Sequence, residues 1–399
     1  GAVNNFNIAN AYKYYRVLVT AVQNTTCCFQ FAEVDFYNTG QTAPAGDAVS
    51  SATFANNSSS NSTITPDAIT TLLSAANNVV LQANNDITVS NAITANNGSG
   101  NGGNLTMQAG RSVLVNANIT TDNGNLTLIA NDLTANGVVN AQRDSGTAVI
   151  TLASGTTMNT GTGAFTSTIR AGTGKTNRTS GDITLSNVTA GSLVATNSGP
   201  TSGSDILDNG VLTIAGTSSF TTSVSNADIT LNSANALTGA VTLNTTGSSG
   251  NATIDNGTTA LIIAQSSVGG NLALTSGHAS GITDSGTVTV GGNLTAATDA
   301  NNGVIILGTL AVNGTVALTT NGAGNAAIDN GTTALIIAQS SVGGELHLRS
   351  GHASGITDSG TVTVGGNFSA TTDANNGVIN LGTLAVDGTV ALTTNGSGN

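Results

Sequence analysis

The sequence has little charge, few aromatic residues and almost no proline. Of its 399 residues, 7% are charged and 3% are aromatic, with three Pro and no Trp, whereas an ordinary soluble chain has about 25% charged residues. Low charge together with few apolar residues would indicate disorder. Here, however, 38% of the residues are apolar, and they alternate with Thr, Ser and Asn. This composition predicts a β-rich solenoid with a narrow apolar core and a neutral, hydroxyl-rich surface.

The scarcity of basic residues restricts the partners. There are eight Lys and Arg against 20 Asp and Glu, and the formal net charge is −12. Nucleic acids and anionic membrane surfaces need clustered Lys and Arg, and the sequence shows no basic stripe. The apolar runs are also shorter than the ~18 residues that a membrane span needs. We therefore expect neither a nucleic-acid partner nor a membrane-spanning helix.

Cysteine is nearly absent. The two cysteines, Cys27 and Cys28, are neighbours, and a bond between neighbours departs from ordinary disulfide geometry. They are free thiols, partners of cysteines outside this chain, a vicinal bridge, or small buried apolar residues of a strand. A long chain without further cysteine suits an exported protein that avoids disulfide chemistry.

Aromatic residues divide the chain. Nine of the twelve Phe and Tyr lie in the first 54 residues. Residues 15–19 and 29–37 alternate aromatic or β-branched residues with polar ones, which predicts strands. We interpret residues 1–38 as a β-strand segment and residues 39–66, which are rich in Ser, Asn and Ala, as a linker or cap.

The remainder is repetitive. Residues 254–327 return almost unchanged as residues 328–399, so that Asp255 matches Asp329, 74 positions later. Across the two copies the element V-x-G-x-[LVF] recurs in steps of 22, 22, 30, 22 and 22 residues, beginning at Val268. We interpret the unit as three coils, one of them with an eight-residue insertion.

Coils of this length predict a parallel β-helix over residues 67–399. Short strands such as 288–290, which alternates apolar and polar residues, and 304–307, which is apolar throughout, are separated by turns. Stacked coils pair each strand with its copy about 4.8 Å away. The Asn-Gly and Gly-Gly corners supply the positive φ values that sharp turns need. At about 22–30 residues per coil, the array holds roughly 12–15 coils. The fold class is therefore all-β.

The segments 77–89, 102–112 and 123–130 resemble the coils of filamentous-haemagglutinin-type large exoproteins, which Gram-negative bacteria export by two-partner secretion. The resemblance covers residues 67–399 and implies a right-handed β-helix, a secreted or cell-surface location, and a role in adhesion, aggregation or matrix building. The amino-terminal secretion domain of that family is not visible in the sequence. Separately, residues 15–19 and 29–37 resemble the last strands of a discoidin-like, galactose-binding β-sandwich, which would make residues 1–38 the end of such a domain.

Residues with catalytic chemistry fall into turns. His278 and His352 are equivalent positions three predicted coils apart, about 14 Å, so they cannot share a zinc ion; His347 has no neighbouring cysteine. The acids of the repeats stand in D-N-G, T-D-S-G and T-D-A-N-N turns, and an active site is not built twice. We expect no enzyme and no cofactor, although stacked turn carboxylates leave calcium as a candidate ligand.

Asn-x-Ser/Thr sequons are abundant and are candidate glycosylation sites. We single out Asn104, Asn125, Asn256, Asn293, Asn330 and Asn367.

Two functions remain from the sequence. The first is an extracellular structural or adhesive stalk, or a filament-forming protein, at a bacterial cell surface, which self-associates end to end or side by side and contacts glycans or a cell-surface receptor. The alternative is a carbohydrate-binding surface protein whose β-helix acts as a spacer.

Overall fold

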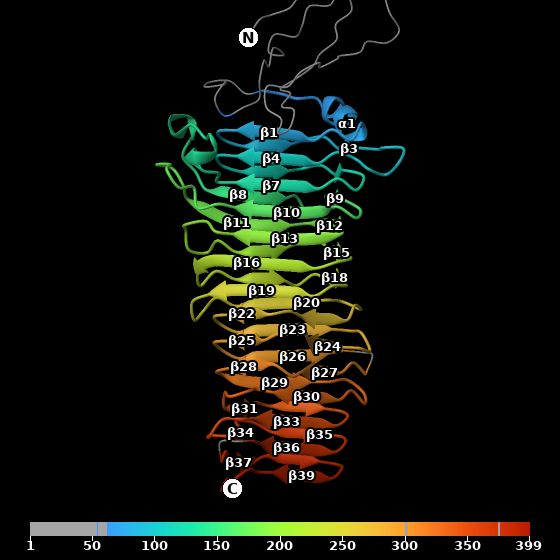
Figure 1. Ribbon diagram of the computed structural model, residues 1–399, viewed down its shortest axis with the longest axis vertical. Coiled ribbons are helices and arrows are strands. Elements are labelled where there is room, and N and C mark those ends of the chain that lie inside the picture. The colour runs from blue at the N-terminus through green and yellow to red at the C-terminus, as the bar shows by residue number, and fades with distance from the viewer. Residues whose placement is uncertain (1–53, 55–61, 300–301, 374–375) are drawn as a thin grey trace, which may run out of the picture.

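The structure is a computed structural model that describes residue 54 and residues 62–299, 302–373 and 376–399. It is an all-β parallel solenoid of about 14 turns, here called coils, with 4% helix. The coils stack into a rod whose strands all lie across the long axis (Figure 1). The predicted fold class and number of coils are confirmed. The predicted segment 1–38 and the two cysteines lie outside the described residues. In the part of the chain that the structure describes, no helix is long and apolar enough to cross a membrane.

The first coil is covered by one helix, α1 (Pro66–Ser74). Pro66 suits the first helical position and Asp67 the first turn, and Ile69 and Leu73, one helical turn apart, are buried against the first coil. The Leu73 carbonyl accepts the Gly103 N–H at 2.8 Å. The helix therefore caps the solenoid, and the first strand of the coils begins at Val79.

Two sheets run the length of the rod, and a third ends midway. The first sheet contains β1 (Val79–Ala83), β4 (Leu105–Ala109), β7 (Leu126–Ala130), β10 (Ala164–Ile169), β13 (Ser192–Asn197), β16 (Ser218–Ser225), β19 (Val241–Thr246), β21 (Leu261–Ile263), β22 (Ser266–Val268), β24 (Ile282–Asp284), β25 (Val288–Val290), β27 (Ile305–Leu307), β28 (Leu310–Val312), β30 (Ala326–Asp329), β33 (Leu346–Ser350), β36 (Phe368–Thr372) and β39 (Val390–Thr393). The second contains β2 (Ile87–Val89), β5 (Val113–Val115), β8 (Ala148–Leu152), β11 (Ser180–Leu185), β14 (Ile206–Asp208), β17 (Ile229–Leu231), β20 (Ala252–Asp255), β23 (Leu272–Ser276), β26 (Leu294–Thr298), β29 (Thr315–Thr319), β31 (Leu335–Ile337), β32 (Ser340–Val342), β34 (Ile356–Asp358), β35 (Val362–Val364), β37 (Ile379–Asn380) and β38 (Leu384–Val386). The third contains β3 (Ile93–Thr94), β6 (Ile119–Thr120), β9 (Thr157–Asn159), β12 (Asn187–Ala190), β15 (Leu212–Ile214) and β18 (Ala236–Leu237).

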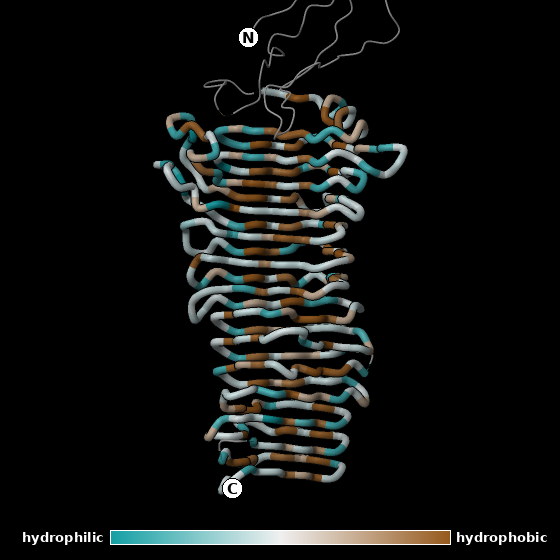
Figure 2. Tube along the Cα trace, viewed as in Figure 1, coloured by the Kyte–Doolittle hydropathy of each residue, from teal (hydrophilic) through white to brown (hydrophobic). Residues whose placement is uncertain are grey.

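Alternation along each strand builds the core. In β4, Leu105, Met107 and Ala109 are fully buried while the intervening residues are half-buried. Each coil places its apolar residues directly below those of the coil before, as Phe165 lies below Leu126. The apolar and polar segments alternate along every level of the tube in Figure 2. A continuous apolar column therefore fills the rod.

The third sheet ends where a buried asparagine takes the place of a strand. The Leu237 N–H donates to Asn256 Oδ1 at 2.8 Å, and Asn256 Nδ2 donates back to the Leu237 carbonyl at 3.1 Å. Asn330 does the same for Val312, at 2.8 and 3.1 Å. One amide thus supplies the donor and the acceptor that a paired strand would supply. We call residues 79–246 the three-sheet region and residues 252–399 the repeat region.

The two copies of the 74-residue unit lie on opposite sheets. The motif valines of β22, β25 and β28 stack on the first sheet, one coil apart, whereas those of β32, β35 and β38 stack on the second. Between β28 and β32 the chain passes through β29 on the second sheet and β30 on the first. The 30-residue step is therefore one and a half coils, and the unit is three and a half. The predicted three coils with an eight-residue insertion are wrong.

Candidate functional site

Two of the six singled-out sequons are closed to modification in the folded chain. Asn256 and Asn330 are 0% exposed. Beyond the bonds to the preceding strand, Asn256 Nδ2 also donates to the carbonyls of Thr259 and Ala260, at 3.2 and 2.9 Å. A glycan on that nitrogen would replace these bonds and would have no space. The two residues are structural.

The other four sequons belong to ladders. Asn125, Asn293 and Asn367 are exposed and Asn104 is half-buried, and each stands just before a strand of its coil. Each Oδ1 accepts a backbone N–H of the next coil, at 2.8–3.1 Å. The longest such ladder consists of Asp182, Asp205, Asp228, Asn251, Asn271 and Asn293. These side chains hold consecutive coils in register, and glycosylation of the exposed ones stays a prediction.

Three of the ladder positions are adjacent carboxylates. Burial raises the pKa of Asp205, and the charges of Asp182 and Asp228 raise it further, while the Asp228 N–H bond opposes the shift. The stacked acids thus repel each other but retain the register bond that an asparagine would make.

The histidines form no common site. His278 follows β23 on the second sheet and His352 follows β33 on the first, so the predicted stack at about 14 Å is wrong, although the two remain apart. Each Nδ1 accepts a backbone N–H two residues later, at 3.0 Å. His347 Nδ1 lies 2.6 Å from Ser369 Oγ on the neighbouring strand.

The turn carboxylates support corners. Asp284 accepts the N–H of Gly308 and both the N–H and the hydroxyl of Thr309, at 2.6–3.0 Å. Asp358 repeats this with Gly382 and Thr383, and the Gly382 N–H lowers the pKa of Asp358. Among the described residues, no three His, Cys, Asp or Glu side chains gather as metal ligands.

A polar groove of about 420 Å³ lies on the first sheet. It lies where strand β19 pairs with both β21 and β22. At the kink between β21 and β22, the Ser266 hydroxyl accepts the Leu243 N–H at 3.0 Å. The groove is lined by Thr242, Asn244, Gln265, Ser266, Ser267, Thr287 and Thr289. Among the described residues, only the Asn244 and Ser266 side chains of this groove have hydrogen-bond partners. Its remaining hydroxyl and amide groups are available to a neutral polar ligand.

Because the 74-residue unit is three and a half coils, this half-turn repeat places a similar surface on the opposite sheet, where Ala317 and Thr319 take the places of Thr242 and Asn244. There the Leu318 N–H donates to Ser340 Oγ at 3.0 Å, and Thr319, Ser341 and Thr363 pair across β29, β32 and β35. Ser341 and Thr363 are exposed, as are Ser267 and Thr289.

A pair of loops within the three-sheet region gathers basic residues, which the sequence analysis did not predict. The loops are residues 131–147, with the short helices η1 (Thr134–Asn136) and η2 (Asn140–Gln142), and residues 170–179. Five of the six described basic residues stand in or beside this loop pair: Arg111, Arg143, Arg170, Lys175 and Arg178.

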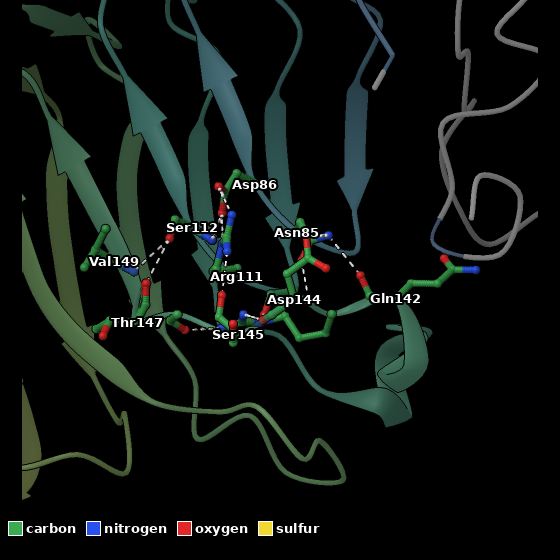
Figure 3. Close-up of polar contacts among 12 residues, drawn as sticks. Asn85, Asp86, Arg111, Ser112, Gln142, Asp144, Ser145, Thr147 and Val149 are labelled. Carbon is green, nitrogen blue, oxygen red and sulfur yellow. Dashed lines mark hydrogen bonds and ion pairs between the residues drawn. The ribbon is translucent and has the colours of Figure 1, made fainter. Parts of the chain in front are cut away.

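A carboxylate and several backbone carbonyls hold two of these cations in place. Arg111 forms a two-bond ion pair with Asp86 at 2.7 and 2.8 Å and also donates to the Ser145 carbonyl (Figure 3). Burial is the largest single effect on the pKa of Asp86 and raises it, but the hydrogen bonds from Arg111 and Ser112 and the charges of Arg111 and Arg143 together lower that pKa below its ordinary value. Arg143 is 2% exposed and donates to the backbone carbonyls of Gly110 and Gly146, at 2.8 and 3.0 Å. Burial lowers its pKa to about 10.

Comparison with protein-family models, with curated proteins and with solved structures gives no match. What the structure itself supports is the parallel β-solenoid architecture.

Proposed function

We propose that the protein is an extracellular structural or adhesive rod of a bacterial surface, non-catalytic and of the filamentous-haemagglutinin-like kind. The observation that supports this proposal is the half-turn repeat, which presents similar polar surfaces on the two opposite sheets of one stiff array. Repeated, weakly specific contacts along a shaft bind through multivalency rather than through one deep pocket. Adhesion and side-by-side or end-to-end assembly both use such surfaces.

The groove favours a second candidate function, the recognition of a neutral carbohydrate. Each residue of its lining carries a hydroxyl or an amide group, which matches the hydrogen-bonding groups of an uncharged sugar chain. On this alternative the rod is a carbohydrate-binding surface protein, and the rest of the solenoid is a spacer.

The test is display of the full chain on a bacterium that neither aggregates nor adheres. We expect the cells to gain aggregation or attachment to glycan-coated surfaces. The double variant Thr289→Lys and Thr363→Lys, which places a bulky cation on an exposed position of each sheet, should remove the gain. Thr213→Lys, an exposed position on the third sheet, is the matched control and should retain it. Displayed, folded protein without any gain would refute the proposal.

A further inference from the structure

The second loop of the pair carries a buried lysine. Lys175, the single lysine among the described residues, is 6% exposed. Its Nζ donates to the Gly110 carbonyl at 2.6 Å and to Asn131 Oδ1 at 2.8 Å. No carboxylate appears among these partners, so the amine is held by neutral oxygens alone.

Its partner Asn131 is immobilised by the same loop. Asn131 follows β7, is 0% exposed and has a φ of 51°. Its Nδ2 donates to the carbonyls of Arg170 and Arg178, at 2.8 and 3.0 Å. Residues 170–178 therefore enclose the amide on its nitrogen side with two carbonyls and on its oxygen side with the lysine.

The lysine nitrogen lies close to the amide carbon. Because a C=O bond measures about 1.23 Å, a nitrogen 2.8 Å from Oδ1 is at most about 4 Å from Cγ. Reacting atoms in near-attack geometry are about 3–3.5 Å apart, so a small shift of the flexible lysine suffices.

The environment favours the neutral amine. Burial is the larger cause that lowers the pKa of Lys175, to about 8, and the positive charge of Arg143 adds to it, while Asp132 acts in the opposite direction. The uncharged form of Nζ, which is the nucleophilic one, is therefore more accessible near neutral pH than in an exposed lysine.

A carboxylate with a free oxygen stands next in the chain. Asp132 is 0% exposed, and its Oδ1 accepts from Leu133 N, Asn136 Nδ2 and Arg170 Nη1, at 2.6–2.8 Å. Its Oδ2 has no hydrogen-bond partner among the described residues. A buried polar atom without a partner is uncommon in folded proteins, and a carboxylate oxygen in this state can accept a proton.

We propose that Lys175 and Asn131 join in an intramolecular isopeptide bond. The Nζ lone pair forms a bond to Asn131 Cγ, the Cγ–Nδ2 bond breaks, and Nδ2 leaves as ammonia. The proton that Nζ loses passes by way of Asp132 to the departing nitrogen, and nothing is oxidised or reduced. The carbonyls of Arg170 and Arg178 face that nitrogen and stabilise the positive charge that it develops. The product is a covalent link between the corner after β7 and the loop after β10.

Peptide mapping by tandem mass spectrometry of the full chain, purified folded at neutral pH, tests the proposal. We expect a branched peptide that joins residues 131 and 175, and an intact mass lower by one ammonia. Unmodified Lys175 and Asn131 peptides as the main species after prolonged incubation would overturn it.

Three variants separate the bond from other losses of ammonia. Asn-Gly sequences can cyclise with the same loss, so the mass deficit must disappear in Lys175→Arg, which keeps the charge but is not a nucleophile. Asn131→Asp should lose water instead of ammonia. Asp132→Asn should slow the reaction at least tenfold in a time course, with an unchanged β-sheet circular dichroism spectrum. An unchanged rate would remove Asp132 from the mechanism. A branched peptide is the decisive readout even if a variant folds poorly.

Discussion

The three-sheet region and the repeat region close each coil in different ways. In the three-sheet region, three strands stack on three separate sheets. In the repeat region, two short strands such as β21 and β22 share one sheet and are separated by a kink. At the kink the backbone ladder is interrupted, and the Ser266 hydroxyl supplies the missing hydrogen bond. At the corners before β21 and β31, the buried side chains of Asn256 and Asn330 do the same for the preceding coil. The comparison shows that the repeat region depends on a few buried polar side chains where the other region depends on backbone pairing.

The regions also differ in their register ladder. Asp182, Asp205 and Asp228 make it in the three-sheet region, whereas Asn251, Asn271 and Asn293 continue it near and within the repeats. An amide makes the same N–H bond without charge repulsion. A ladder of asparagines can therefore be extended over many coils without accumulating charge repulsion between neighbouring positions.

The largest effect is expected from the buried asparagines. Asn256→Ala leaves several buried backbone groups without partners, at about 1–3 kcal/mol each, so we expect the repeat region to lose roughly 3 kcal/mol or more of unfolding free energy. Thermal and urea unfolding would measure it. Asn293→Ala, an exposed ladder position, is the control. Equal losses of unfolding free energy in the two variants would contradict the conclusion that the buried Asn256 stabilises the chain more than the exposed Asn293.

The kink serines test whether the two faces are equivalent. Ser266→Ala and Ser340→Ala each leave one buried N–H, of Leu243 or Leu318, unpaired, which costs about 1–3 kcal/mol. We expect similar losses in the two variants, measured by urea unfolding. A loss of unfolding free energy in one variant alone would show that the two kinks do not contribute equally to stability.

The register ladder is expected to give the smallest effect. Because the folded-state pKa of Asp205 is raised, its charged form opposes folding above that pKa, and the penalty is absent below the ordinary aspartate pKa. Asp205→Asn should thus stabilise the chain at neutral pH by less than about 1 kcal/mol, and the gain should fade as the pH drops toward and below 3.8. Asn271→Asp should show the opposite sign, and unfolding midpoints across pH would check both. A pH-independent gain would exclude a charge effect.

Local patterns in the sequence predict most of the fold. The alternation in segments such as residues 288–290 predicts buried and exposed sides of strands, and the Asn-Gly corners predict turns, because both depend on neighbouring residues. The half-turn offset could not be predicted in this way. A 30-residue step fits either one coil with an insertion or one and a half coils, and only the pairing of distant strands decides between them.

The candidate site was harder to predict for the same reason. Asn256 and Asn293 both begin sequons, but the first is buried and the second is exposed. The difference depends on how each residue packs against the preceding coil, which is distant in the sequence. Lys175 and Gly110 are 65 positions apart and meet only through two loops. No periodic signal in the sequence marks them.

Because each 74-residue unit is three and a half coils, the side of the rod on which later coils present a given surface depends on whether the number of units before them is odd or even. Removing or adding one 74-residue unit would rotate everything beyond it to the opposite side of the rod, whereas a change of two units would restore the original side. Recombination between the near-identical copies could thus reverse the side on which distal surfaces are presented without altering a single residue in them.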